Sequence, residues 1–208
     1  KRDARIISDR FSKYRACRTL KGKTAADAMH WVLDLMGHRC VRRIYCDNSG
    51  ELENACNNLG IPRGKSSPGV PRSNARAERV NRDVLAGART LLIHAGLPGA
   101  VWPLPTSHDC HMDNLRKGAS GPSPWSLTHG CDFLGQEIPF GALGEFLLGK
   151  RARKQLGHVE QRLWPGILIA HDANNGGKWA CAYIVLAVRL QDGHDLLDLP
   201  GIKGIARQ

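Results

Sequence analysis

The sequence predicts an α/β fold, in which a mixed sheet flanked by helices is followed by a small β-rich region. Two observations lead to this prediction. In the N-terminal half, short apolar runs typical of strands alternate with segments of helical periodicity. After a Gly- and Pro-rich stretch at 118–124, the chain instead carries short apolar or alternating runs separated by turn residues. The order hairpin, helix, strand, helix is expected of a sheet covered by helices.

The first elements have clear boundaries in the sequence. Residues 5–20 read as two strand segments joined near residues 9–12. Thr24 and Asp27 have the spacing of a capping box, which predicts a helix over 25–36, and Gly37 ends it. The helical period places four apolar residues on the inward face: Met29, Val32, Leu33 and Met36.

The next strand ends at an acidic residue. Val41, Ile44 and Cys46 predict a strand, which the turn residues 48–50 break immediately after Asp47. Asp47 is therefore expected at the carboxyl end of a strand, the edge where α/β proteins gather functional groups. The alternative is that Asp47 only caps a turn. Asn48 is a candidate N-cap for a short helix that Gly60 ends.

A longer helix begins after a Pro-rich loop at 62–71 and continues beyond residue 90. Its apolar stripe consists of Ala77, Val80, Val84, Ala88 and Leu91. Glu78 lies in its first turns and Arg82 one turn further on. The favourable interaction of an acid with the helix dipole, together with an i,i+4 ion pair, is an alternative explanation for Glu78.

The charge of the chain indicates a polyanionic partner. It carries 30 Lys and Arg against 19 Asp and Glu, a net charge of +11 with pI about 9.7. Nucleic acid is favoured over membrane because no run of ~18 residues is apolar. A basic surface without a partner is the alternative. The chain starts at Lys1 rather than Met, which we interpret as a segment of a longer protein.

The cysteines favour a reducing, intracellular setting. Seven cysteines include no C-x-x-C pair, so neither a disulfide framework nor a zinc ribbon is predicted. The run 108–111, His-Asp-Cys-His, lacks a second ligand pair and is expected on an ordinary helix over about 106–116.

In their order along the chain, these motifs resemble the catalytic core of LTR-retrotransposon integrases, most closely the copia type. The first motif consists of Asp47, Asn48, Gly50 and Glu51; the second consists of Asn74, Ala77, Glu78, Arg79, Asn81 and Arg82. Weaker matches follow at 121–125 and 176–179. The resemblance implies an RNase H-like architecture, membership of a transposon polyprotein, and a polynucleotidyl transferase that performs DNA 3′-end processing and strand transfer.

The resemblance also implies the site and its partners. Asp47 and Glu78 would hold Mg²⁺ or Mn²⁺, as two ions, because hard divalent cations prefer oxygen ligands. The family's third acid is expected upstream of Lys1; in a different register Asp9 or Asp3 takes that role. Partners would be element-end and target DNA, with a homo-oligomer when active, in the nucleus when the protein acts on chromosomal DNA. The separation of Asp47 and Glu78 is shorter than the family's usual one.

Nucleic-acid contacts are expected from two groups of polar and basic residues. The group around the acids consists of Lys65, Arg72, Asn74, Arg76, Arg79 and Arg82. The second group is Lys150, Arg151 and Arg153, in the densest basic run of the chain. Such side chains bind phosphates without reading sequence. A solvated basic loop is the alternative for the second group, and Arg82 steadying Glu78 is the alternative for Arg82.

The expected organisation has four parts. A core lacking its first strand spans 1–117, a Gly/Pro-rich connector 118–135, a β-rich domain 136–190, for which an SH3-like fold is a candidate, and a tail 191–208. In the third part, runs 166–170 and 179–190 predict two strands joined by the hairpin turn 172–177. A catalytically inactive or domesticated nucleic-acid-binding remnant is the alternative function, and a related RNase H-like nuclease or transposase is a third.

Overall fold

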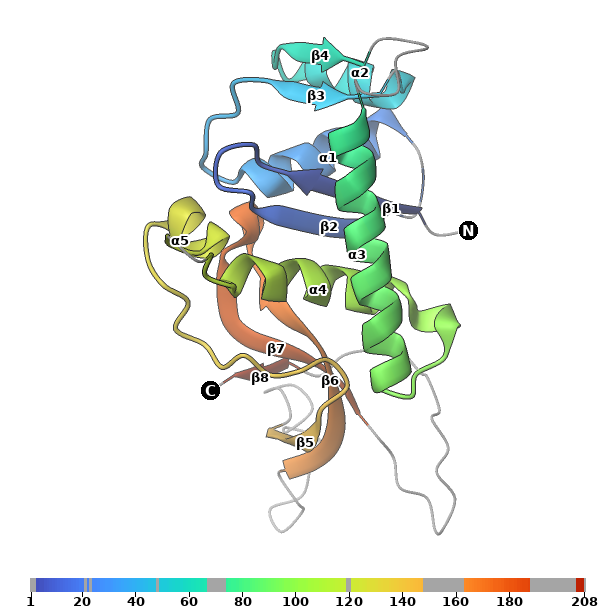
Figure 1. The fold of residues 1–208 in the computed structure, drawn as a ribbon, viewed down its shortest axis with the longest axis vertical. Coiled ribbons are helices and arrows are strands. Elements are labelled where there is room, and N and C mark those ends of the chain that lie inside the picture. Colours follow the sequence, from blue (N-terminus) through green and yellow to red (C-terminus); the bar gives the residue numbers. More distant parts are fainter. Residues whose placement is uncertain are drawn as a thin grey trace.

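In Figure 1 two small sheets lie in the upper part of the molecule and a four-stranded sheet in the lower part, with helix α4 (Pro103–Leu115) crossing between them. The computed structural model describes residues 3–20, 22, 24–47, 49–66, 74–118, 121–147, 163–187 and 205–207. The predictions for Arg72, Lys150, Arg151 and Arg153, and most of the tail, lie outside these residues.

The predicted N-terminal hairpin is confirmed. Strands β1 (Asp3–Ser8) and β2 (Arg15–Leu20) pair antiparallel, with Ser8 opposite Arg15. The Asp9 carboxylate closes the connection by accepting hydrogen bonds from the backbone N–H and the hydroxyl of Ser12, both at 2.7 Å. Lys13 follows with a left-handed φ of 64°, a conformation that a tight turn imposes on a side-chain-bearing residue.

Helix α1 (Ala25–Met36) has the predicted capping box, in which both hydrogen bonds between Thr24 and Asp27 are present. Its buried face differs from the predicted one. Ala28, Trp31 and Val32 are buried, whereas Leu33 is 42% exposed. The prediction for Leu33 was wrong because the buried stripe runs through Ala28, Trp31, Val32 and Leu35, and Leu33 lies about 100° around the helix from Val32.

The Asp47 strand is short and has a parallel neighbour. Strand β3 (Ile44–Cys46) pairs with β4 (Arg63–Lys65), and helix α2 (Gly50–Asn58) connects them. The N-cap of α2 is Ser49, whose φ of −71° and ψ of 128° are typical of an N-cap. The prediction of Asn48, which lies outside the described residues, was therefore wrong by one position. Gly60 follows the helix with a φ of +64°.

The two small sheets share one hydrophobic core without sharing hydrogen bonds. Among the described strands, β1 pairs only with β2, and β3 only with β4. Figure 1 shows β3 between β4 and the β1–β2 hairpin. Ile7 of β1 nevertheless packs against the core that contains Trp31, Val32 and Ile44. The facing edges of β1 and β3 are thus free of strand pairing within the described chain.

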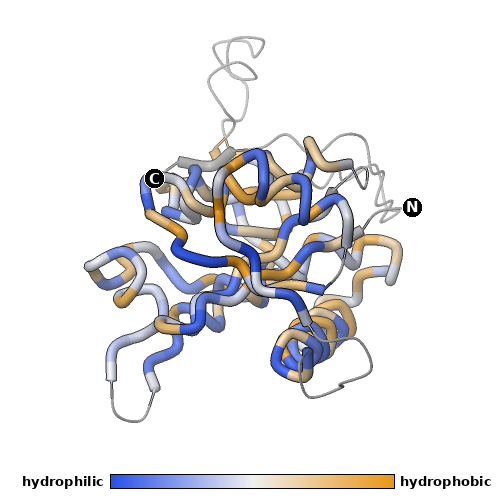
Figure 2. Tube along the Cα trace, turned by 90° about the horizontal axis from the view of Figure 1, so that it is seen from above, coloured by the Kyte–Doolittle hydropathy of each residue, from blue (hydrophilic) through white to orange (hydrophobic). Residues whose placement is uncertain are grey.

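Helix α3 (Ala75–His94) runs along the outside of the fold. It buries Val84, Ala88 and Leu92, while the predicted stripe residue Ala77 is exposed. Ala77 lies in the first turn, where the helix extends past the core it packs against. Seen from above (Figure 2), α3 stands nearly end-on at the edge of the molecule, so much of its circumference faces solvent.

Helix α4 (Pro103–Leu115) follows the 3₁₀ turn η2 (Gly99–Val101) and confirms the predicted helix in this region. Pro103 stands in its first turn, where the missing N–H of proline costs nothing. The short helix α5 (Pro124–His129) was not predicted. Ser123 caps α5 by accepting a hydrogen bond from the Ser126 N–H at 3.1 Å.

The C-terminal sheet is antiparallel in the order β5 (Leu143–Leu147), β6 (Leu163–Ala173), β7 (Trp179–Ala187) and β8 (Ile205–Arg207). The predicted hairpin between the second and third of these strands is confirmed. Leu92 of α3 packs with Phe140, Ile169 and Leu186, so the sheet shares a core with the helices. The division into a core, a connector and a β-rich domain stays a prediction.

The turn between β6 and β7 docks on the N-terminal part of the chain. This turn, η3 (Asn175–Gly177), receives a hydrogen bond from the Tyr14 hydroxyl to the Gly177 carbonyl at 3.2 Å and one from Arg39 to the Gly176 carbonyl at 2.9 Å. A Cβ on Gly37 would lie 2.8 Å from the Gly176 Cα. Glycine at this contact is required for the close approach of the two backbones.

Candidate active site and nucleic-acid interface

Asp47 is the first residue after β3, as predicted, and its side chain is exposed. Its carboxylate oxygen Oδ1 accepts a hydrogen bond from the backbone N–H of Ser49 at 3.3 Å. This contact across the turn is typical of an Asx turn and fixes the carboxylate at the strand end. The structure therefore supports the alternative that Asp47 shapes a turn, and within the described residues its second carboxylate oxygen accepts no hydrogen bond.

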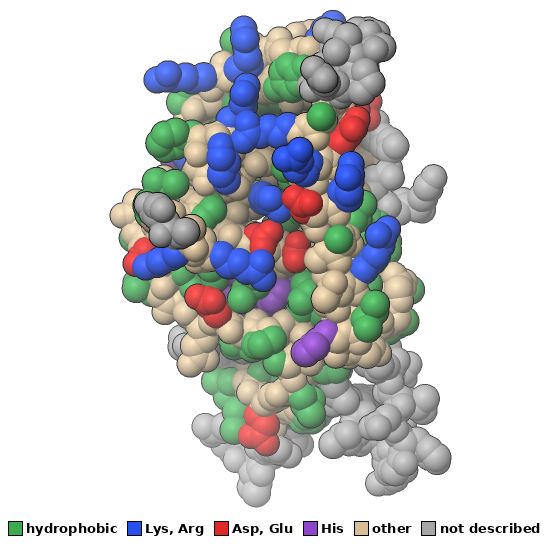
Figure 3. Space-filling model, viewed as in Figure 1, with side chains coloured by type: hydrophobic (Ala, Val, Ile, Leu, Met, Phe, Trp, Pro, Cys, Tyr) green, Lys and Arg blue, Asp and Glu red, His purple; other side chains and the backbone are tan. Residues whose placement is uncertain are grey.

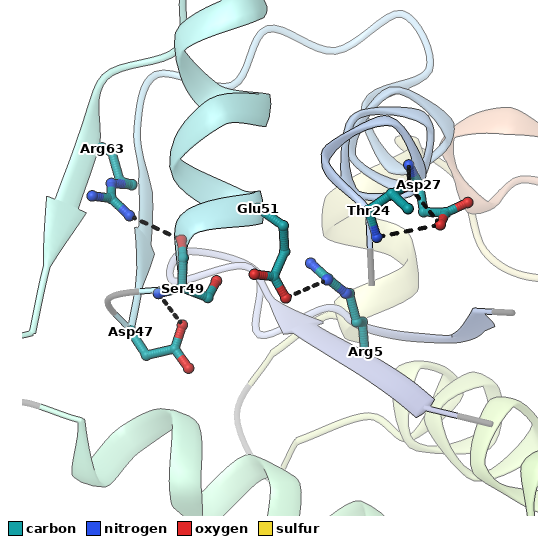
Figure 4. A network of polar contacts seen from close by, with 7 residues as sticks. All are labelled: Arg5, Thr24, Asp27, Asp47, Ser49, Glu51 and Arg63. Carbon is teal, nitrogen blue, oxygen red and sulfur yellow. Dashed lines mark hydrogen bonds and ion pairs between the residues drawn. The ribbon is translucent and has the colours of Figure 1, made fainter. Parts of the chain in front are cut away.

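Two arginines that the sequence analysis did not single out hold this turn from opposite sides. Arg5 of β1 donates to the Glu51 carboxylate at 3.1 Å, and the side chain of Arg5 is only 13% exposed. Arg63 of β4 lies 2.7 Å from the Glu53 carboxylate and donates to the Ser49 carbonyl at 3.5 Å. Figure 4 shows the Arg5–Glu51 and Arg63–Ser49 contacts at the first turn of α2, next to Asp47. No local sequence signal links residues that lie 46 positions apart, as Arg5 and Glu51 do.

Glu78 lies in the first turn of α3, and its side chain is exposed. Figures 1 and 4 both place the N-terminal end of α3 beside the carboxyl end of β3. Glu78 and Arg82, both described, do not form the i,i+4 ion pair that the alternative explanation requires. The position of Glu78 in the helix dipole remains part of its explanation.

The two acids offer oxygen donors alone, the ligand type that Mg²⁺ and Mn²⁺ prefer. Within the described residues, no group of three or more His, Cys, Asp or Glu side chains has a geometry that could hold a metal ion. The oxygen ligands of Asp47 and Glu78 thus suit a hard cation. Among the described residues, no third acid completes the set.

Asp9, the alternative acid, is committed to the hairpin turn. Its partial burial raises the pKa of the carboxyl, but hydrogen bonds from Ser12, Phe11 and Arg10 outweigh burial and lower the pKa overall. Both Ser12 donors reach the same oxygen, Oδ2. Asp3 begins β1.

The run 108–111 lies on α4, as predicted, with His108 and Cys110 buried at 1% and 2% exposure. Burial raises the pKa of Asp109 to about 6, and the neighbouring Asp113 adds to the effect. His111 stacks on His171 of β6, with ring centroids 4.3 Å apart. His108 and His111 pack between α4 and the C-terminal sheet, whereas Cys110 packs against Cys17 of β2 and Val84 of α3.

The predicted nucleic-acid-binding residues fall into two sets. Asn74 is the N-cap of α3, and Arg76, Arg79 and Arg82 are exposed on its first turns. Lys65 lies in β4 and is paired with Glu53, whose carboxylate is 2.9 Å from its ammonium nitrogen. Figure 3 shows Lys and Arg side chains gathered on the upper half of this face, around a smaller group of acids.

Comparisons with known proteins place this arrangement in a fold class. A chain from the cryoEM structure of the simian T-cell lymphotropic virus intasome in complex with PP2A regulatory subunit B56 gamma matches 98% of this chain and 71% of its own length, at 18% identity and a TM-score of 0.50. The BIV integrase catalytic core domain matches 60% of this chain and 83% of its own, at 21% identity and a TM-score of 0.47. The fold is the RNase H-like mixed α/β fold of retroviral integrases, as the sequence predicted.

The sequence relatives are transposon proteins. The chain is 32% identical over 90 residues to the retrovirus-related Pol polyprotein from transposon TNT 1-94 of Nicotiana tabacum, and 32% identical over 116 residues to that from transposon RE2 of Arabidopsis thaliana. These matches cover 41% and 52% of this chain but only 7% and 8% of the polyproteins. No family model matches the chain. The chain is thus a relative of the retrovirus-related Pol polyproteins of plant transposons, which confirms the predicted resemblance.

None of the helices in the described parts of the chain combines the length and apolar character needed to cross a membrane.

Proposed function

We propose that this chain is the catalytic core segment of a retrotransposon integrase that processes DNA 3′ ends and joins them to target DNA. The observation that carries the proposal is the placement of two exposed carboxylates, Asp47 at the carboxyl end of β3 and Glu78 in the first turn of α3, at neighbouring ends of two elements. The fold class and the transposon relatives support it.

Asp47 and Glu78 would hold divalent cations, Mg²⁺ or Mn²⁺, as two ions. Such ions, when bound, supply positive charge that offsets the charge accumulating on a scissile phosphate. The chain's own residues position Asp47: the Ser49 N–H orients its carboxylate, and the Arg5–Glu51 and Arg63–Glu53 pairs fix the turn on which it stands. The arginines of α3 would bind phosphates of the DNA backbone.

We expect the third acid of the site on a further strand, as the resemblance implies. Two unpaired strand edges support this expectation. The facing edges of β1 and β3 pair with no described strand, although Ile7 and Ile44 on either side contribute to one core. A strand inserted there would join the two small sheets into one and bring its residues to the edge where Asp47 lies.

Element-end and target DNA are the proposed partners, in a homo-oligomer and in the nucleus when the protein acts on chromosomal DNA. The alternative function is a remnant of the same fold that binds nucleic acid without catalysis. It is favoured by one observation, the incomplete set of acids among the described residues.

Strand transfer separates the two functions. The chain extended upstream in its reading frame is incubated with Mg²⁺, a labelled DNA end and a target plasmid. The proposal predicts joined products that disappear in Asp47→Asn and in Glu78→Gln, while DNA binding stays within about twofold of the parent. Products from a nuclease would be cut but not joined. DNA binding without any product would favour the remnant.

A further inference from the structure

A cleft lies between the tip of the β1–β2 hairpin and the first turns of α3, with a volume of about 530 Å³. The hairpin supplies Ser8, Lys13 and Arg15 to its wall, and the helix supplies Arg76, Arg79 and Asp83. Four of these side chains are basic and one is acidic. The sequence analysis named only the two α3 arginines among the basic ones, because nothing local connects residue 13 to residue 76.

The charges within the cleft are not equally available. Arg15 is engaged: its guanidinium lies 3.1 Å from the Asp113 carboxylate and 3.6 Å from that of Asp83. Arg15 therefore joins β2, α3 and α4, and its charge is largely offset together with that of Asp83. Arg76 and Arg79 are exposed, and neither forms an ion pair with any described residue. The remaining positive charge belongs to Lys13, Arg76 and Arg79.

The hairpin holds Lys13 in a defined place. The two hydrogen bonds from Ser12 to the Asp9 carboxylate close the turn, and the Lys13 N–H donates to the Asp9 carbonyl at 3.1 Å. Ser12 is buried at 4% exposure, so the tip is anchored to the fold. The wall opposite α3 is thus a preorganised turn, and the Lys13 ammonium on it donates a hydrogen bond to the Arg10 carbonyl at 2.5 Å.

The α3 residues that line the cleft and Glu78 lie on different sides of the helix. Arg76, Arg79 and Asp83 are spaced i, i+3 and i+7, so they form one stripe toward the hairpin. Glu78 is two positions from Arg76, about 200° around the helix axis. The cleft therefore adjoins the Glu78 site through α3 without overlapping it.

The chemistry of the lining selects the ligand. Three unneutralised cations in an open cleft without an aromatic lining residue suit consecutive phosphates, whereas a stacked base or an apolar ligand finds no matching surface. We propose that this cleft binds the sugar–phosphate backbone of a DNA strand, gripped from both sides by Lys13 of the hairpin and by Arg76 and Arg79 of α3. The inference rests on the proposed function, because it assumes that DNA is the partner.

The test measures the salt dependence of duplex DNA binding by fluorescence anisotropy, with EDTA present so that no chemistry contributes. The affinity K falls with salt, so the slope of log K against log salt is negative. Each phosphate contact that is removed reduces the magnitude of this slope by about 1. We expect Lys13→Gln to reduce this magnitude by about 1 and Arg76→Gln/Arg79→Gln by about 2.

Matched controls come from the same elements. Arg10 is exposed in the same hairpin connection and Arg89 is exposed further along α3, and neither lines the cleft. Arg10→Gln removes one charge, as Lys13→Gln does, and Arg10→Gln/Arg89→Gln removes two, as the double α3 variant does; both controls should leave the slope unchanged. Far-ultraviolet circular dichroism and the melting temperature of every variant verify that the fold is retained.

Two results overturn the cleft proposal. Equal slope changes in cleft and control variants would show that the whole basic surface binds diffusely, and displacement of DNA by polyglutamate at equal charge would show an acidic polypeptide site. Failure of the proposed function looks different, since strand transfer would be absent while Lys13→Gln still reduces the magnitude of the slope and Arg10→Gln does not.

Discussion

Arg5 on β1 and Glu51 at the start of α2 form an ion pair with a nitrogen–oxygen distance of 3.1 Å. It is the polar counterpart of the apolar contact between Ile7 and the core around Ile44, because both join the hairpin to the β3–α2 unit. Glu51 stands four residues after Asp47. The order of the turn after β3, and with it the position of the Asp47 carboxylate, therefore depends on this ion pair.

Removing this pair should destabilise the protein measurably. The side chains are only 13% and 26% exposed, so Arg5→Gln leaves Glu51 with an unmet charge in a partly buried position. We expect a loss of about 1–3 kcal/mol in the free energy of unfolding, measured by urea denaturation. The control is Arg18→Gln, which breaks the more exposed pair with Asp34 and should cost less than about 1 kcal/mol. Equal losses in the two variants would refute the role given to Arg5.

Substitution of Gly37 by alanine should weaken the docking of the β6–β7 turn. Alanine at Gly37 would carry a Cβ at 2.8 Å from the Gly176 Cα, on a residue with a φ of +54°. Backbone strain and overpacking together should lower the free energy of unfolding by about 2–4 kcal/mol, measured by thermal denaturation. Gly96→Ala is the control, since Gly96 has a similar φ of +64° and open space around it, and only strain of about 1 kcal/mol is expected. If both substitutions shift the melting temperature alike, the turn does not dock as described.

Stability should fall in mild acid because of the histidines between α4, α5 and β6. Burial lowers the pKa of His108 to about 4, of His111 to about 3 and of His129 to about 4, and it lowers that of His171. Since these folded-state values lie below the ordinary 6.5, the unfolded chain binds more protons. The stability that these neutral, buried histidines contribute is fully present above pH 6.5 and is lost as the pH falls toward 4. Asp109, with a raised pKa, opposes this trend.

Urea midpoints at pH 7.5 and pH 5.0 measure the effect. His111 packs edge-on against Trp125 and Phe133 and stacks on His171, so His111→Phe keeps an aromatic ring in place and removes one titrating group. This variant should lose less stability between the two pH values than the parent. An unchanged pH dependence in His111→Phe would assign the effect to other groups.

Local signals explain which parts of the fold were predictable. The capping box of Thr24 and Asp27, the Asp47 strand end and the β6–β7 turn are each encoded within a few residues, and the structure has all three. Strand β4 was missed because Arg-Gly-Lys has no apolar or β-branched residue, and it becomes a strand only by pairing with Ile44–Cys46. Helix α5 had a readable signal in Ser123-Pro124, which was interpreted as part of a connector.

The candidate site was predictable where a motif lies in one segment and not where the fold joins segments. Asp47 and Glu78 came from such motifs, and the structure places each at the expected end of its element. The Arg5–Glu51 and Arg63–Glu53 pairs and the Lys13 wall of the cleft depend on tertiary contacts that no spacing encodes. The roles of the acids and of the basic residues stay predictions.

The most direct test of the account is whether Asp47 and Glu78 bind the same metal site. Binding of Mn²⁺ is measured by electron paramagnetic resonance in the chain extended upstream in its reading frame. We predict that Asp47→Asn and Glu78→Gln each weaken Mn²⁺ binding by about tenfold or more, whereas Glu145→Gln, at an exposed position on β5, leaves it unchanged. Mn²⁺ binding that is unaffected by either substitution would contradict the account.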